Sequence, residues 1–435
     1  MRRTFLVLLI WWASEPAIAQ DTKSEIDLAQ ARSSFQEAQL LCEKDGGTLW
    51  GQSLCVPMAY IDPNTREFVT NQLDSGGTLA RREGLYVGVW PDTLPIANST
   101  IIWSGTKWTT VLWPLPDDKI ARASLMMHES FHNVEGRLGF PSQIPANAHL
   151  DTREGRTWLR LEWRALQAAL MTSGDTRVQA VQDALTFRAY RRSLFPGSAE
   201  SERALEMHEG LAEYTGVRLC GLAVDQIPTY VAGDFYDSRT KVVSFISSFA
   251  YWSGPAYGTL LDELGIAWRK NLTADEDLGN LLRTAVGITL PADLAAAAGE
   301  AAGRYDGAVV KGEELAREQE HNRILADLRA RLIDGPVLIL PLMQMNLQYD
   351  PRGMVSMDSL GTVYATIRIS DVWGIVEVTG RGALMATTWT ALRVPAPVDP
   401  AVRPLQGDGW TLQLNDGWGL APAARSGDYT LRMKQ

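Results

Sequence analysis

The segment 125-LMMHESFHNVEG-136 carries two of the five histidines in this chain of 435 residues. His128 and His132 are four positions apart, so on an α-helix their imidazole rings leave the same face and can reach one metal ion. Glu129 follows at about 100° around the helix, close enough to act on a water molecule held by that ion. The spacing therefore predicts a helix with a Zn²⁺ site, in which both histidines are ligands and Glu129 is the general base. The alternative is an amphipathic helix whose two imidazoles are solvated or cap a neighbouring group.

A second segment, 204-ALEMHEGLAEYTG-216, lies on a helix predicted over residues 199–218. Its Glu209 and Glu213 are again four positions apart and share one helix face. A catalytic zinc ion has three protein ligands and one open position, so Glu209 can complete the ligand set. Glu213, one turn later, can accept a hydrogen bond from the ring nitrogen of a ligand histidine that does not bind the metal. The alternative for both carboxylates is a solvated acidic helix face.

The order of these two segments, "HESFH" followed by "HEGLAEY", resembles the gluzincin metallopeptidases, the thermolysin-like and aminopeptidase-like group. In that group the second helix commonly carries Asn-Glu-Gly-x-Ala-x-Tyr, and its glutamate is the third zinc ligand. The positions that match in this chain are Glu209, Gly210, Ala212 and Tyr214. The resemblance covers residues 118–265 and implies a zincin-like catalytic core with Glu209 as third ligand, Glu129 as base and Glu213 behind a ligand histidine. It also implies that the substrate is a polypeptide.

The second segment departs from the family pattern in two ways. His208 stands where the family commonly has asparagine. The separation of Glu209 from His132 is also much longer than in the commonest gluzincins, because of an insertion that includes 149-HLDTREGRTWLRLEWRAL-166 and the helix after it. The insertion leaves Glu154 and Glu162, on a predicted inserted helix, as alternatives for the third ligand. On a regular helix His208 faces a different direction from Glu209, so we expect it to orient substrate or to pack rather than to bind the metal.

A third segment, 249-FAYWSGPAYGTLLDELG-265, falls in a helix predicted over residues 238–264. It resembles the Tyr-x-x-Gly stretch of peptidase-MA proteins, which lies on a later helix bordering the catalytic cleft. Gluzincins use a tyrosine or histidine from such a position to stabilise the oxyanion of the tetrahedral intermediate. Tyr251 is the first candidate for this role and Tyr257 is the second. The alternative is that these tyrosines pack in the core.

The segment 107-KWTTVLWPLP-116 runs directly into the first histidine helix. In this class of protein an edge strand beside the cleft pairs with extended substrate, so we expect the segment to bind polypeptide backbone. Trp108 and Trp113 would then flank the substrate groove. The alternative is that both tryptophans belong to the core.

Motifs of several other enzyme classes are missing from the sequence. It contains no Gly-x-Ser-x-Gly elbow, no phosphate-binding loop and no Cys-x-x-Cys pair. It also lacks the Gly-x-Met-x-Asn motif with which aminopeptidases hold the free amino end of a substrate, which favours an endopeptidase or oligopeptidase. Two competing functions are a non-proteolytic envelope protein with a structural or vestigial zinc site, and a zinc amidase that acts on a cell-wall component.

The pattern of apolar residues predicts an α+β protein whose parts follow one another along the chain. Residues 1–19 are predicted to be a signal peptide, and residues 20–116 an N-terminal helix and a small antiparallel sheet that belong to the catalytic unit. Residues 117–334 are predicted to form a mainly helical core, and residues 335–435 a C-terminal all-β domain, a sandwich or barrel. A stripe of leucines within residues 291–333 is expected to pack back on the catalytic core.

The N-terminal stretch "MRRTFLVLLIWWASEPAIAQ" has the features of a secretory signal peptide. A basic start precedes an apolar run at residues 5–13 that is too short to span a bilayer, and Ala-Ile-Ala precedes a cleavage site. We therefore expect an exported protein, periplasmic or extracellular, with no membrane span. The net charge of −10 argues against nucleic acid as a partner.

The three cysteines allow one disulfide in an oxidising compartment. Cys42 and Cys55 are the favoured pair because they would close a short loop, and Cys220 is then left as a buried thiol. The two other pairings stay open at the level of sequence.

Overall fold

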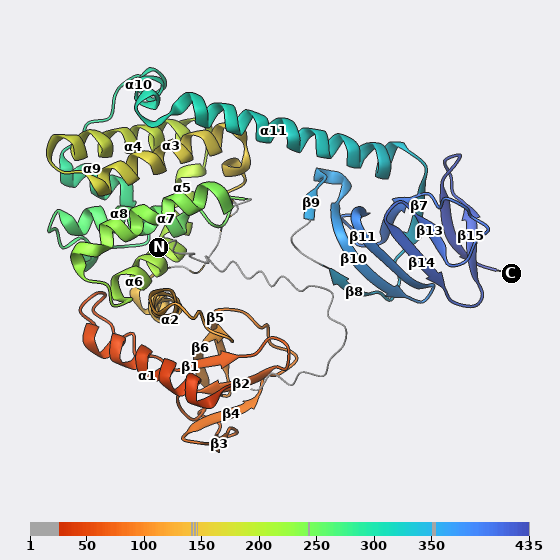
Figure 1. The fold of residues 1–435 in the computed structure, drawn as a ribbon, viewed down its shortest axis with the longest axis horizontal. Coiled ribbons are helices and arrows are strands. Elements are labelled where there is room, and N and C mark those ends of the chain that lie inside the picture. The colour runs from red at the N-terminus through yellow and green to blue at the C-terminus, as the bar shows by residue number, and fades with distance from the viewer. Residues whose placement is uncertain are drawn as a thin grey trace. The chain divides into compact units, whose positions relative to one another are not determined.

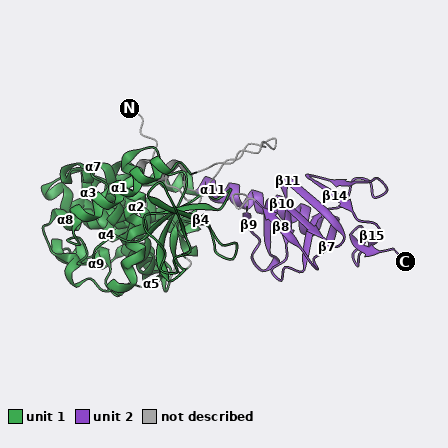
Figure 2. Ribbon diagram, turned by 90° about the horizontal axis from the view of Figure 1, so that it is seen from below, with its two compact units in different colours: residues 1–314 green, residues 315–435 purple. Residues whose placement is uncertain are grey.

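The computed structural model describes residues 26–434, except for residues 141, 143–144, 146, 242–243 and 350–353 and the side chains of residues 236–241. The predicted signal peptide lies outside the described residues. Helices and strands are both abundant, and the strands form one sheet in the N-terminal part and one in the C-terminal part. The predicted α+β class is therefore confirmed. The chain divides into two compact units, Met1–Glu314 and Leu315–Gln435 (Figure 2).

Helix α1, Leu28–Asp45, is delimited by its capping residues. The carboxylate of Asp27 accepts hydrogen bonds from two backbone N–H groups of the first turn, which have no partner inside the helix. Gly46 follows the last turn with a φ of +55°, a left-handed conformation that glycine adopts without strain. Local sequence therefore sets both ends of this helix.

A disulfide bond links the last turn of α1 to the segment that follows it. Cys42 forms a disulfide with Cys55, which confirms the favoured pairing. Cys220 is buried and is the free cysteine among the described residues, also as predicted.

The N-terminal sheet has strands from three hairpins. They are β1 Met58–Ile61, β2 Glu67–Thr70, β3 Ala80–Arg82, β4 Leu85–Val89, β5 Ser99–Trp103 and β6 Thr106–Leu112, in the order β3-β4-β2-β1-β6-β5. Ser104 and Gly105, between β5 and β6, have φ of +47° and +73°. Positive φ at both residues suits a tight two-residue turn whose twist matches that of the strands.

The sheet is mixed, so the prediction of an antiparallel sheet is wrong in one pairing. β1 and β6 run parallel, with Met58 opposite Thr109. The hairpin partners are antiparallel because short turns reverse the chain. In the chain, the strands β2 to β5 lie between β1 and β6. This connection is long enough for β6 to return beside β1 and run in the same direction.

The helices of unit 1 form its larger part (Figure 1). Besides α1, they include α2 Lys119–Val134, α3 Arg153–Met171, α4 Gly174–Leu194, α5 Ser198–Leu205, α6 Leu211–Leu219, α7 Ile227–Lys241, α8 Ala250–Glu263, α9 Leu278–Val286 and α10 Leu294–Ala302.

The prediction of a single helix over residues 238–264 is wrong, because this range covers the end of α7 and the whole of α8. In the segment between α7 and α8, the hydroxyl of Ser244 and the backbone N–H of Phe245 donate hydrogen bonds to the side chain of Asp151. A side chain distant in sequence thus provides partners for backbone and side-chain groups at a turn.

Helix α2 lies between the sheet and α6 (Figure 1). Asp118 caps its start, as predicted, by accepting from the N–H groups of Ile120 and Ala121. Gly216 of α6 faces Ser124, and a Cβ at position 216 would lie 2.6 Å from the backbone oxygen of Ser124. The two helices are therefore in close contact, and the second half of α2 is buried almost all round.

Unit 2 is built mainly from a ten-stranded sheet. Its strands are β7 Val337–Pro341, β8 Asn346–Tyr349, β9 Met354–Ser356, β10 Thr362–Asp371, β11 Gly374–Met385, β12 Ala391–Pro395, β13 Leu405–Gly407, β14 Trp410–Leu414, β15 Trp418–Pro422 and β16 Tyr429–Met433. The main path is β13-β14-β11-β12-β7-β16-β15, and β10 pairs with β11, β8 and β9. The pairings join the strands in one sheet, with β16 and β7 parallel and the other pairs antiparallel.

The division between the units falls within α11, Gly307–Arg329, and not at the expected boundary after residue 334. The leucine stripe explains the difference. Leu328 and Leu332 pack with Met357 and Val363 of unit 2, so the expectation that this stripe packs on the catalytic core is wrong. The stripe is short, and its period alone did not specify its partner.

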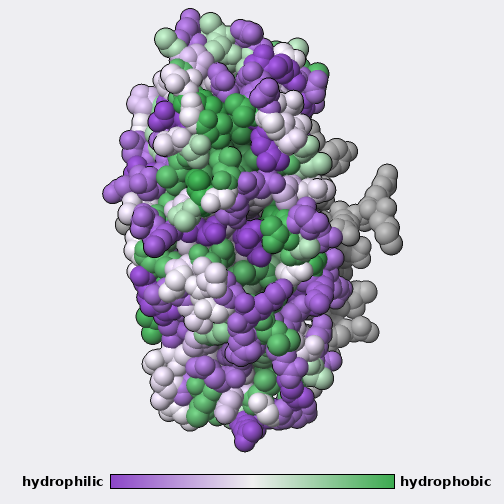
Figure 3. All heavy atoms as spheres, turned by 90° about the vertical axis from the view of Figure 1, so that its left-hand side faces the viewer, coloured by the Kyte–Doolittle hydropathy of each residue, from purple (hydrophilic) through white to green (hydrophobic). Residues whose placement is uncertain are grey.

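The face of the molecule seen in Figure 3 mixes hydrophilic and hydrophobic side chains, with hydrophobic ones gathered in its upper part. Among the described residues, no helix combines the length and the apolar character that crossing a bilayer requires.

Candidate metal centre

Helix α2 presents His128 and His132 to the same side. Both side chains are buried, and their Nε2 atoms lie 3.1 Å apart. The spacing of four positions places the rings one turn apart, as expected from the helix geometry. The structure thus brings the two predicted imidazole ligands to one point.

Glu209 reaches this point from the second helical segment. Its Oε2 atom lies 3.4 Å from Nε2 of His128 and 3.5 Å from Nε2 of His132. In a tetrahedral zinc site with ligand distances of about 2.0–2.1 Å, two ligand atoms lie about 3.3 Å apart. The three atoms therefore fit one face of such a tetrahedron, which leaves the fourth position for water or substrate.

Glu209 lies in a π-turn that the sequence did not reveal. The turn, η3 Glu206–Gly210, separates α5 from α6 in one continuous helical stretch. A π-turn adds a residue to the helical turn and changes the direction of the side chains around it. Its first residue, Glu206, is held by both terminal nitrogens of Arg188, which belongs to α4. The segment between α2 and α5 therefore contributes to the placement of Glu209.

A carboxylate lies behind each of the two histidines of α2. Glu213 Oε2 is 2.8 Å from Nδ1 of His128, as predicted, and Glu135 Oε2 is 3.2 Å from Nδ1 of His132. A carboxylate at Nδ1 fixes the tautomer and directs Nε2 toward a metal. Sequence reasoning missed Glu135, although its position three residues after His132 placed it on the same side of the predicted helix.

His208 joins the same cluster by a different contact. Its Nδ1 atom lies 2.7 Å from Oε2 of Glu135, so His132, Glu135 and His208 form a second group of possible ligands. The distance of 2.7 Å is that of a charge-assisted hydrogen bond and is short for two ligands of one zinc ion. The group of His128, His132 and Glu209 is therefore the better candidate for a metal site.

The charges around His128, His132 and Glu209 favour a cation at this point. Burial opposes charge on His132, but hydrogen bonds with Glu135 and Glu209 raise the pKa of His132 to about 9. Burial also opposes charge on His128, but Glu209 and Glu213 hold the pKa of His128 well above its ordinary value. Without a metal, protons on the imidazoles supply the positive charge that the surrounding carboxylates require.

Glu129 is buried beside the same group. Burial raises the pKa of its carboxyl, the imidazoles of His128 and His132 lower it, and the net shift is upward. A carboxylate whose pKa lies above its ordinary value accepts a proton from water more readily at neutral pH.

Tyr251 of α8 also contacts the group. Its hydroxyl donates a hydrogen bond to Oε2 of Glu209 over 2.6 Å, and its ring stacks on that of His128 with centroids 5.5 Å apart. Burial and the charge of Glu209 raise the pKa of Tyr251 well above its usual value, so the hydroxyl remains a donor. Tyr257, the second candidate, lies elsewhere and donates to Glu162 over 2.7 Å.

Two glycines allow Tyr251 and Glu209 to meet. A Cβ at Gly254 would lie 2.3 Å from Cα of Gly210, so α8 and the π-turn touch through their backbones. Gly254 follows Tyr251 by less than one turn, and Gly210 directly follows Glu209. The Tyr-x-x-Gly spacing thus has a packing reason in this chain.

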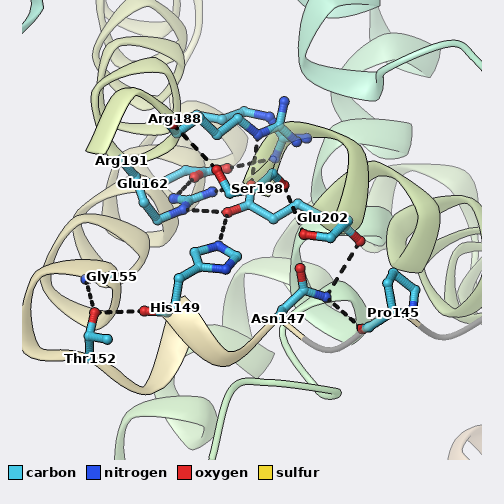
Figure 4. Close-up of polar contacts among 12 residues, drawn as sticks. Pro145, Asn147, His149, Thr152, Gly155, Glu162, Arg188, Arg191, Ser198 and Glu202 are labelled. Carbon is cyan, nitrogen blue, oxygen red and sulfur yellow. Dashed lines mark hydrogen bonds and ion pairs between the residues drawn. The ribbon is translucent and has the colours of Figure 1, made fainter. Parts of the chain in front are cut away.

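The alternative third ligands have other partners. Glu162 is fully buried between Arg188 and Arg191, whose guanidinium groups contact its two oxygens (Figure 4). Glu154 accepts a hydrogen bond from the indole N–H of Trp158 over 3.1 Å. Of the three predicted candidates, the structure brings Glu209 to the histidines.

The predicted substrate strand is not an edge strand. Residues 107–116 supply most of β6, which pairs with β1 on one side and β5 on the other. Trp108 and Trp113 are buried and belong to the core, so neither flanks a groove. β5, added as a hairpin partner, is the edge strand on this side of the sheet.

Comparison with known proteins gives no match: no family model, curated sequence or solved structure is significantly similar to this chain. The functional argument therefore depends on the residues and their geometry.

Zinc binding should release protons, because the metal must replace those on the imidazoles. Since the pKa of His132 is raised to about 9 in the absence of metal, its proton is bound at pH 7.5 and must leave when the nitrogen binds zinc. We expect release of at least one proton, and an affinity that rises with pH up to about 9. Calorimetric titration in buffers of different ionisation enthalpy measures both; binding without proton release would contradict this account of the site.

Substitution Gly254→Ala should separate α8 from the π-turn. The added methyl would overlap the backbone of Gly210, so we expect unit 1 to lose about 1–3 kcal/mol of unfolding free energy and its zinc affinity to fall. Denaturation curves and zinc titration test this. Gly299→Ala on α10 is the matched control, because a Cβ there meets open space; an equal effect of both changes would refute the close-contact argument.

Proposed function

We propose that this chain is an exported zinc metallopeptidase of the gluzincin type. The observation that carries the proposal is the convergence of Nε2 of His128, Nε2 of His132 and Oε2 of Glu209 within 3.1–3.5 Å of one another. The donor set, two imidazoles and one carboxylate with a carboxylate behind each imidazole, is that of catalytic zinc sites. Export is proposed from the N-terminal sequence alone.

A zinc ion held by these three residues would lower the pKa of a water molecule and polarise the carbonyl of a peptide bond. Glu129 accepts the proton of the attacking water and later donates it to the departing amine, for which its raised pKa is suited. Glu135 and Glu213 hold the ligand rings in orientation. The hydroxyl of Tyr251 keeps its proton and donates it in a hydrogen bond to Glu209. On release of Glu209 the same proton could be donated to the negative charge that develops on the carbonyl oxygen.

Substrate recognition is proposed at the sheet edge. β5 offers unpaired backbone groups at the end of the sheet order and contacts α2, which carries the histidines. An extended peptide can add to such an edge through main-chain hydrogen bonds, largely independent of its side chains. This replaces the expectation that β6 binds the substrate. An endopeptidase or oligopeptidase fits this mode of binding.

The metal ligand set can be tested on purified protein. Elemental analysis should find one zinc per chain in the wild type, and Glu209→Ala should lose it because two imidazoles alone bind zinc weakly. Glu154→Gln is the matched control, since Glu154 contacts Trp158 and not the histidines. Retention of stoichiometric zinc by Glu209→Ala would contradict the assignment of the third ligand.

The chemistry can be tested with Glu129→Gln, which keeps the size of the side chain but removes the base. We expect zinc content to be unchanged and cleavage of a peptide library to fall about 10²–10⁴-fold. Full activity of this variant would contradict the role of Glu129. Absence of peptide cleavage by the zinc-loaded wild type, with digestion of peptidoglycan instead, would replace the peptidase by an amidase.

A further inference from the structure

Glu135 contacts two histidines with one oxygen. Its Oε2 lies 3.2 Å from Nδ1 of His132 and 2.7 Å from Nδ1 of His208. A carboxylate oxygen is a hydrogen-bond acceptor, so both histidines donate to it from Nδ1.

The other nitrogen of His208 faces the third ligand. Nε2 of His208 lies 3.4 Å from Oε1 of Glu209, and the ring packs against that of His132 with centroids 4.5 Å apart. The imidazole thus lies between the carboxylates of Glu135 and Glu209, and with an N–H on each ring nitrogen it is a donor toward both. On a regular helix the neighbour of Glu209 would face elsewhere, and the π-turn removes this restriction.

The two oxygens of Glu209 have different surroundings as a result. Oε2 faces the ligand imidazoles and accepts the hydrogen bond of Tyr251, whereas Oε1 faces His208. Rotation of the carboxylate would break contacts on both sides. A carboxylate whose oxygens are separated in this way binds a metal through one oxygen and leaves a coordination position open.

We propose that His208 is a positioning residue that holds Oε1 of Glu209 away from the metal, with Glu135 fixing the orientation of the His208 ring. The proposal rests on the proposed zinc site and goes beyond it, because it assigns a role to the residue that replaces the family's asparagine. His208 keeps Glu209 a one-oxygen ligand, and the fourth position of the metal is thereby kept free for water.

Two substitutions separate the contacts of His208. In His208→Asn the side-chain amide reaches about as far as Nδ1, so the contact with Glu135 is retained and that with Glu209 is lost. In His208→Gln the amide reaches about as far as Nε2, so the contact with Glu209 is retained and that with Glu135 is weakened. His149→Asn is the matched control. Nε2 of His149 pairs with the carboxylate of Glu202 over 2.8 Å (Figure 4), and neither residue belongs to the group of His128, His132 and Glu209.

The measurements are the zinc dissociation constant, by competition with a chromophoric chelator, and the visible spectrum of the Co²⁺-substituted protein. We expect His208→Asn to weaken zinc binding about 10–100-fold. Its Co²⁺ spectrum should lose intensity, because a second oxygen of Glu209 raises the coordination number. His208→Gln should remain close to the wild type in both measurements. His149→Asn should change neither, even if it lowers the melting temperature.

The outcomes separate this inference from the proposed function. If the wild type binds neither Zn²⁺ nor Co²⁺, the metal site itself is refuted. If the wild type binds both and His208→Asn has the wild-type spectrum and affinity, the role of His208 is refuted and the metal site stands. Equal losses in His208→Asn and His208→Gln would also refute it, because the contact with Oε1 would then not be the one that matters.

Discussion

The pairing of buried carboxylates with imidazoles is the interaction on which this structure depends. Glu135 and Glu209 are both buried and ionised next to His132, and Glu129 lies beside them. Several carboxylates in so small a volume destabilise one another unless positive charge lies among them. Protons on the imidazoles can supply this charge, and so can a divalent cation at the point where the nitrogen and oxygen atoms converge. The fold is arranged so that either one completes the site.

The scaffold holds this arrangement from several directions. The sheet and α6 enclose α2, so the histidines cannot turn away from the interior. Contact between Gly210 and Gly254 sets the distance of α8 from the π-turn. Arg188 of α4 binds Glu206 at the start of that turn. The segment between the two histidine-bearing helices therefore helps to support the site.

Local patterns predicted the parts of the site that depend on helix geometry. The spacing of His128 and His132, and the position of Glu213 one turn after Glu209, follow from 3.6 residues per turn. The contact of His208 with Glu135 could not be predicted from the regular helix period, because His208 lies in a π-turn that no local sequence pattern indicates. For a related reason, the sequence did not predict the parallel pairing of β1 with β6 or the packing of Leu328 against Met357 and Val363. Each depends on the choice between distant partners that sequence periodicity does not specify.

The most direct test of the account is diffraction from crystals of the zinc-loaded protein, recorded on both sides of the zinc absorption edge. The account predicts one anomalous peak about 2.0–2.2 Å from Nε2 of His128, Nε2 of His132 and Oε2 of Glu209, with Oε1 of Glu209 facing His208. No peak at that point, or a peak bound by Glu135 and His208 instead, would contradict it.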